Sequence, residues 1–268
     1  MYHTVFVSCY AAAHHQEKET TEMAEQQVQV KAGCSVMLGK RPRQRIQGLV
    51  HDTFESKHPR SHSNGVCSRI KVVPMRGKAK TKAYEETLKH LQDIVGPEKQ
   101  VIELDVTSKT KDTELRKLSP FYPVGDIPVD KLVPDLKGET SKSVEGLWQG
   151  LKVFEKAKHD PGKFTITTMK NLKRSSRKFG RVLGHYQGAS KPYLNYAEAR
   201  RHFYIPAYRW ALSNRVKEIV KSRIVDKIKN GDAVILRDFN SNGDPDVPKV
   251  LSHAQVLKQY ALELTNQP

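Results

Sequence analysis

Four side chains that could do chemistry together lie in one short stretch, Ser141–Phe154. Glu145 is followed by Trp148, Gln149 and Lys152, at spacings of three, one and three residues. Residues three and four apart share one side of a helix, so a carboxylate, an indole, an amide and an ammonium would converge there. Such a set suits a polar aromatic ligand. Taken alone, the pattern is more typical of an ordinary helix with an acid in its first turn, a core tryptophan and an exposed rim.

Two further stretches could line a ligand pocket. Leu118–Pro128 holds three prolines and a glycine, which fix an extended loop, and Phe121 and Tyr122 inside it could stack against a flat ring. Composition alone favours the alternative, a rigid turn that plugs the core. Gly184 would let the backbone approach a ligand closely. His185 follows it, although a lone histidine is more often structural than catalytic.

A third polar stretch, Asp238–Asp246, matches the opening of a calcium-binding EF-hand loop. Its twelfth position would be Lys249, where calcium needs a bidentate acid, and the loop follows a strand-like AVIL run. The sequence therefore predicts no metal here. Polar loops after strands commonly carry ligand contacts, so Asp238 and Asn240 are candidate binding residues. The chain lacks the Walker A, G-x-G-x-x-G, G-x-S-x-G and H-E-x-x-H motifs, and we expect no cofactor.

Positive charge is concentrated in two runs. Lys and Arg number 46 against 29 Asp and Glu, giving a formal charge of +17. Residues 156–181 hold nine basic residues and one acid, and KRPRQR occupies 40–45. This clustering predicts a phosphate-facing surface, with RNA preferred over DNA as the partner, although a solvated basic face is the simpler alternative. The residues expected to bind nucleic acid are Lys40, Arg41, Arg43, Arg45, Lys170, Lys173, Arg174, Arg177, Lys178 and Arg181.

Composition excludes several classes of protein. The chain has 268 residues, a mean hydropathy of −0.62 and no apolar run that approaches the roughly 20 residues of a membrane span. Three cysteines without a C-x-x-C pair argue against a disulfide scaffold and a zinc ribbon. We therefore expect a soluble intracellular protein of a reducing compartment with no membrane partner. The compartment stays open, with the mitochondrial matrix among the alternatives, because residues 1–16 lack acids but also lack arginine.

The elements that must position these side chains begin after residue 67. Residues 1–67 have poor apolar periodicity and dense turn formers, so we expect a basic extension of low order, followed by a folded domain at 68–268. Apolar runs and alternation predict strands at 69–74, 101–106 and 233–236. Helical spacing predicts helices at 82–94, 143–154, 193–214, 215–229 and 252–264.

The order of the motifs resembles the NADAR superfamily. Its members carry a loop like Ser119–Pro123, a serine-valine-glutamate helix like Ser143–Phe154 with a later glutamine and lysine, and then a glycine-containing turn. An uncharacterised phage and bacterial branch is more closely similar. The blocks shared with it over about residues 68–264 are Asp105–Ser108, Ser119–Pro123, Ser143–Phe154, Lys173–His185, Ala199–Tyr208 and Leu251–Ala254.

NADAR proteins are N-glycosidases, and some of them remove ADP-ribose from guanine bases or act on riboflavin-pathway intermediates. The resemblance implies a compact, mainly helical α+β fold with a small sheet. It also implies that Glu145 is the active-site glutamate and that Phe121, Tyr122, Trp148, Gln149 and Lys152 line the pocket. A carboxylate suits this chemistry, because cleavage of a ribosyl C–N bond passes through an oxocarbenium-like state that it can stabilise, or because it can deprotonate the attacking water.

Two functions from different classes follow. The first is an N-glycosidase that uses Glu145 on a nucleotide-like or ADP-ribosylated nucleic-acid substrate. The second is a catalytically silent RNA-binding subunit of a large ribonucleoprotein, for instance a mitochondrial ribosome. A third, purely solubilising role for the charge fits less well, because the basic residues cluster. The first two are discriminated by whether Glu145 faces a solvent-filled cavity or is buried under the N-terminal extension.

Overall fold

A parallel three-stranded sheet lies at one end of the computed structural model, which describes residues 64–75 and 78–267. The strands are β1 (Ile70–Pro74), β2 (Val101–Asp105) and β7 (Ala233–Asp238), in the order β1-β7-β2. Val234 stands opposite Ile70 on one side and Ile102 on the other. All three strands occur where the sequence predicts them, and β7 extends two residues further. The described residues belong to one compact unit, delimited as His58–Pro268.

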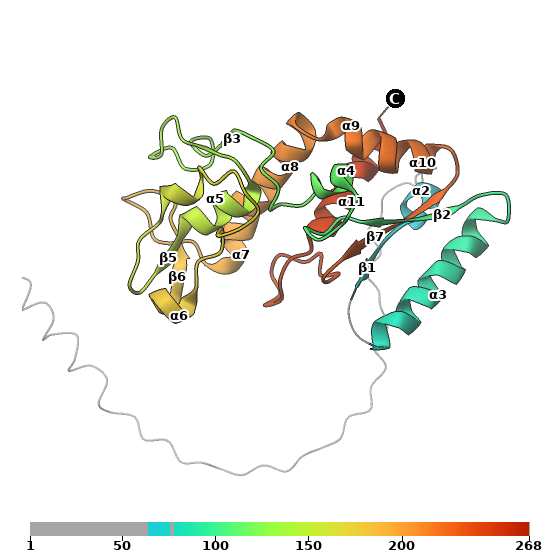
Figure 1. Cartoon of the computed structure of the whole chain (residues 1–268), viewed down its shortest axis with the longest axis horizontal. Helices are drawn as coiled ribbons and strands as arrows, with labels where there is room; N and C mark the ends of the chain where they lie inside the picture. The colour runs from blue at the N-terminus through green and yellow to red at the C-terminus, as the bar shows by residue number, and fades with distance from the viewer. Residues whose placement is uncertain (1–63, 76–77, 268) are drawn as a thin grey trace, which may run out of the picture. The chain divides into compact units, whose positions relative to one another are not determined.

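Helices cover both faces of this sheet, which explains why residues 233–236 of β7 are all apolar. Helix α3 (Lys78–Val95) covers one face, where Leu91 packs with Ala233 and Ile235. Helix α11 (His253–Thr265) lies on the other face, where Val234 and Leu236 join the main core (Figure 1). A strand buried on both sides needs no polar alternation. Helices were predicted at both places.

Two long helical stretches follow β6, and a π-helical turn interrupts each. The first comprises α7 (Tyr196–Ala199), the π turn η2 (Arg200–Tyr204) and α8 (Ile205–Asn214). The second comprises α9 (Lys217–Val220), the π turn η3 (Lys221–Val225) and α10 (Asp226–Lys229). Both helices were predicted, without the π turns. Such turns often occur at functional sites, and η2 packs against α5, which carries Glu145.

The short strands lie around α5 (Val144–Leu151) at the other end of the described unit (Figure 1). Two short antiparallel pairs lie there, β3 (Ile127–Pro128) with β4 (Thr140–Ser141) and β5 (Lys152–Phe154) with β6 (Val182–His185). Short helical turns complete the architecture: α2 (Asn64–Ser68), α4 (Thr113–Arg116), η1 (Pro161–Lys163) and α6 (Ser176–Phe179). The chain is therefore an α+β protein, as expected.

The helix predicted at 143–154 was too long. It ends at Leu151, because Lys152 adopts extended backbone angles and its strand pairs with β6. In the basic stretch between Lys173 and Arg181, only Ser176–Phe179 is helical. Of the expected N-terminal extension, residues 1–63 lie outside the described residues. None of the described helices is long and apolar enough to span a membrane.

Close packing makes Gly150 in α5 indispensable. A Cβ built at this position would lie 2.2 Å from Phe164 Cε1, and Phe164 is fully buried. We expect Gly150→Ala to lower the free energy of unfolding by about 1–3 kcal/mol, because the overpacked ring must move. Urea denaturation measures this. Gly65→Ala, where nothing lies within 4 Å of the added carbon, is the matched control; equal stability of the two variants would contradict the packing.

Candidate functional site

Helix α5 begins at a serine cap that places Glu145 in its first turn. Ser143 is the N-cap, and its hydroxyl oxygen accepts a hydrogen bond from Gly146 N at 3.0 Å. Glu145 N donates to Pro120 O at 2.9 Å, which ties the proline loop to the start of the helix. The positive end of the helix dipole favours a carboxylate at this position. Sequence, cap and loop together fix where the Glu145 backbone lies.

The Glu145 carboxyl group is almost completely buried, with 7% of the residue exposed. Burial raises its pKa, against the opposing effects of the Gln149 hydrogen bond and the charges of Lys152 and Lys173. Gln149 Nε2 donates to Glu145 Oε1 at 2.8 Å. No described residue donates a hydrogen bond to Oε2. A carboxyl group of this kind can hold a proton at a pH where an ordinary glutamate is ionised, and one oxygen is left for a ligand or water.

Lys152 sits in strand β5, directly opposite His185 in β6. Burial lowers the pKa of its ammonium, and the charges of Lys173 and Arg174 lower it further, whereas Glu145 acts in the opposite direction. The pKa values of Glu145 and Lys152 are therefore moved toward each other. Two titratable groups perturbed in this way are the usual partners of general acid–base chemistry.

The imidazole ring of His185 is fully buried beside this pair. Neither ring nitrogen is paired with any described residue, and the imidazole centroid lies 4.0 Å from that of Trp148. Burial, with a smaller effect of Lys152, lowers the pKa of His185 to about 3, so the ring is neutral in ordinary conditions. Gly184 before it has φ +152°, and a Cβ there would lie 2.7 Å from Leu194 O. Gly184 is thus required by backbone packing, and it positions His185.

Trp148 is a core residue whose ring lies next to His185 and Lys152. It is 5% exposed and belongs to the main core, where Tyr196 and Tyr204 meet its ring edge-to-face at 5.2 and 5.7 Å. Lys152 Nζ lies 5.6 Å from its ring centroid. The indole ring is therefore enclosed by other side chains, and its stacking on a substrate stays a prediction. Sequence spacing did not predict these two tyrosines, because Tyr196 in α7 and Tyr204 in η2 lie about 50 residues from Trp148 and reach it only in the folded chain.

Phe121 and Tyr122 are half-buried in the proline loop. Lys173 Nζ lies 5.4 Å from the Phe121 ring centroid, at cation–π distance, and the charge of Lys173 lowers the pKa of Glu145. The loop and the basic segment, which we define as residues 170–181, therefore meet next to the carboxylate. That Phe121 and Tyr122 line a ligand pocket stays a prediction.

Arg174 was predicted to bind nucleic acid, and the structure corrects this. Its guanidinium donates to Lys152 O at 2.5 Å and to Lys158 O at 2.8 Å, and it packs on Phe154 and Phe179 at 4.8 and 5.2 Å. Its side chain is 3% exposed, so it is not available to a phosphate. The other basic residues of this segment are exposed: Lys170, Lys173, Arg177, Lys178 and Arg181. Lys40, Arg41, Arg43 and Arg45 lie outside the described residues.

Asp238 was predicted to contact a ligand, but it belongs to a separate buried network. It is 2% exposed, its Oδ2 accepts from Ser252 Oγ at 2.6 Å, and the same oxygen lies 3.1 Å from His253 Nδ1. These contacts join the end of β7 to the start of α11, so the carboxylate has a structural role. Asn240 Oδ1 accepts from Asn242 N at 3.0 Å, which shapes the loop after β7. Among the described residues, neither side chain forms a hydrogen bond with Glu145, Gln149 or Lys152.

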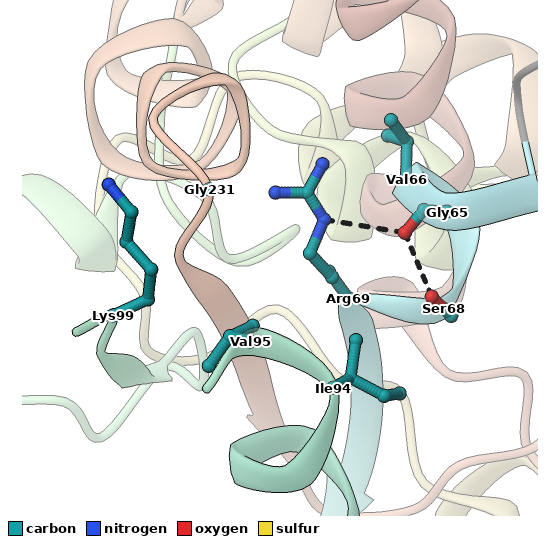
Figure 2. A pocket seen from close by; sticks show the side chains of 8 residues that line it. All are labelled: Gly65, Val66, Ser68, Arg69, Ile94, Val95, Lys99 and Gly231. Atoms are coloured by element: carbon teal, nitrogen blue, oxygen red, sulfur yellow. Dashed lines mark hydrogen bonds between the residues drawn. The ribbon is translucent and has the colours of Figure 1, made fainter. Parts of the chain in front are cut away.

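One hollow of about 440 Å³ lies elsewhere, at the amino-terminal ends of the sheet strands (Figure 2). Arg69 projects into its middle, with Nε donating to Gly65 O at 3.3 Å and Nη1 to Ile228 O at 2.9 Å. Val95, Lys99 and Gly231 form the opposite side. None of the predicted site residues lines this hollow. In the described part of the chain, no three His, Cys, Asp or Glu side chains gather as they would around a metal.

Comparison with known proteins gives one match. Residues 80–257 match the model of a family of unknown function (DUF6939). This range contains every candidate residue from Phe121 to Asn240. No curated protein matches the chain. The match does not bear on the NADAR resemblance, which stays a prediction.

Proposed function

Since the chain belongs to this family of unknown function, DUF6939, we propose a function from the site itself: an N-glycosidase-type hydrolase that cleaves a ribosyl C–N bond with Glu145. The substrate class is a nucleotide-like or ADP-ribosylated group carried by nucleic acid. The observation that carries this proposal is the buried Glu145 carboxyl group, held by Gln149 through one oxygen and flanked by Lys152.

The two titratable groups suit the two proton transfers of such a hydrolysis. Glu145 takes a proton from water as the water oxygen bonds to the anomeric carbon. The electron pair of the C–N bond goes to the departing base, and the Lys152 ammonium supplies a proton to the leaving nitrogen. A raised pKa at the carboxylate strengthens it as a base, and a lowered pKa at the ammonium strengthens it as an acid.

A direct assay tests this proposal. The full chain is incubated with an oligonucleotide that carries ADP-ribose on guanine, and with free nucleosides, and the products are separated by mass. We expect release of the ribosyl group with the base left intact. Release from neither substrate class, at protein concentrations equal to the substrate, would overturn the proposal.

The second candidate, a silent RNA-binding subunit, is favoured by the exposed basic residues of the segment 170–181. Purification from the native source at moderate salt distinguishes it. Stable co-sedimentation with ribosomal RNA and proteins, together with no release in the assay above, would make the carboxylate a remnant of an older enzyme fold.

Both candidates predict that the exposed part of the basic segment binds phosphates. We expect the triple change of Lys173, Arg177 and Lys178 to Gln to weaken binding of a single-stranded oligonucleotide. The slope of log Kd against log salt should fall by about one for each lost phosphate contact. Fluorescence anisotropy across salt concentrations measures both effects.

A charge-matched control uses basic residues at the opposite end of the described unit. Lys82 and Lys89 are exposed on α3, and Lys229 is exposed at the end of α10. Changing these three to Gln removes the same charge. If both triple variants lose affinity equally, the interaction follows net charge alone, and the segment is not a binding surface.

A further inference from the structure

One buried amide connects the basic segment to the Glu145 carboxylate. Gln149 is 4% exposed and uses both ends of its side chain: Nε2 donates to Glu145 Oε1 at 2.8 Å, and Oε1 accepts from Arg174 N at 3.2 Å. With both ends occupied, the amide has one orientation. The carboxylate is thus held in place by the backbone of the basic segment, 25 residues along the chain from Gln149.

The segment is fixed firmly on its inner side. Leu172 is 1% exposed in the core, and Lys163 Nζ donates to Asn171 O at 2.8 Å. The Arg174 side chain is held by two carbonyl oxygens and two phenylalanine rings, as described above. Between these anchors the Lys173 side chain is exposed. Lys173, which is exposed to a phosphate, and Arg174, whose backbone N–H holds Gln149, are therefore neighbours in the chain.

We propose that Gln149 is a positioning residue that couples the basic segment to Glu145, so that a nucleic-acid phosphate bound at Lys173 changes the state of the carboxylate. The proposal rests on the function proposed above, because Glu145 is its reacting group. It adds that nucleic acid activates the site as well as delivering the substrate.

The sign of the effect follows from the groups around the carboxylate. Lys152 from β5 and Lys173 from the basic segment lower the pKa of Glu145, and Tyr204 from η2 also interacts with it. A phosphate paired with Lys173 cancels part of that positive charge. The bound anion therefore raises the pKa of Glu145, which makes the carboxylate a stronger base.

Carbon-13 NMR of the full chain, with labelled glutamate side chains and Glu145→Gln for assignment, tests this without any turnover. The probe is a single-stranded oligothymidylate, which carries phosphates but no scissile ribosyl group on a purine. We expect saturating oligothymidylate to move the Glu145 titration midpoint upward in the unmodified chain. Binding without any change at Glu145, or no binding at all, would overturn the coupling.

Three variants locate the path. Gln149→Met removes both hydrogen bonds at similar volume, so the Glu145 midpoint should rise without oligothymidylate, and the response should shrink to the direct effect of the Lys173 charge. An unchanged response would remove Gln149 from the coupling. Lys173→Gln should abolish most of the response. Lys170→Gln, in the same segment, should weaken binding but leave the response at saturation intact. A full response in Lys173→Gln at saturation would overturn the proposal. Hydrolysis could fail in every assay while these titrations still succeed, so the two proposals can fail separately.

Discussion

Glu145→Gln is expected to lower kcat/KM for release of the ribosyl group by about 100- to 10,000-fold, the usual contribution of a general base. Glutamine keeps the shape of the side chain but cannot take a proton from water. The amide can still meet Gln149, so the hydrogen bond at Oε1 has a replacement. Initial rates over a range of substrate concentrations measure the loss, and kcat should carry most of it.

The stability of the same variant separates catalysis from folding. A carboxylate that is 7% exposed is costly to bury, so Glu145→Gln should fold at least as stably as the unmodified chain. Glu85→Gln, on the exposed surface of α3, is the matched control and should change neither rate nor stability. Retained turnover in Glu145→Gln would remove Glu145 from the mechanism.

Asp238→Asn is expected to lower the free energy of unfolding by about 3–5 kcal/mol, because it leaves a buried charged histidine without its partner. His253 Nδ1 lies 3.1 Å from Asp238 Oδ2, and His253 Nε2 lies 2.8 Å from Val106 O. An imidazolium donates to both acceptors. Burial lowers the pKa of His253, but the Asp238 contact and the Val106 hydrogen bond outweigh it, so the net shift is upward.

The pH dependence of this effect has a definite sign. Because the pKa of His253 is raised in the folded protein, its contribution to the free energy of unfolding is complete below about pH 6.5, the pKa of an unfolded histidine. That contribution is lost as the pH rises through the pKa of the folded state. Burial raises the pKa of Asp238, but His253 and the Ser252 hydroxyl outweigh it and hold it low. Its contribution is complete above about pH 3.9 and is lost in acid through the folded pKa.

Urea denaturation at several pH values measures both statements. Stability from this pair should be greatest between about pH 4 and 6.5, and Asp238→Asn should remove that maximum. Asp93→Asn, an exposed change on α3, should leave the curve unaltered. A loss below 1 kcal/mol in Asp238→Asn would show that the buried pair contributes no net stability.

The sequence predicted the helices and strands well where apolar residues recur with one period. β1 and β7 were found as short apolar runs, and β2 was found from its alternation of apolar and polar residues. The pattern failed at Lys152–Phe154, where apolar spacing continues the helix but pairing with β6 ends it. A partner strand about 30 residues away leaves no mark on local periodicity, so the sequence could not show that α5 stops at Leu151.

The candidate site was predictable only where its residues lie within one helical turn of each other. Glu145 and Gln149 are one helical turn apart, and spacing alone brings them together. His185 reaches the cluster only through the β5–β6 pairing. Charge clustering placed Arg174 with its neighbours, but it cannot distinguish an exposed guanidinium from one packed between two phenylalanines. Burial is set by the fold, and the residue type does not reveal it.

The strand order β1-β7-β2 also constrains how the protein can be made. The two strands that are synthesised first are not hydrogen-bonded to each other in the sheet, and each pairs with β7, which begins at Ala233. On the ribosome, β1 and β2 therefore stay unpaired while more than a hundred further residues are synthesised. Their unpaired edges are meanwhile exposed to other nascent chains. A chain truncated before β7 cannot form the sheet at all, so shortened versions of this protein are expected to aggregate rather than fold in part.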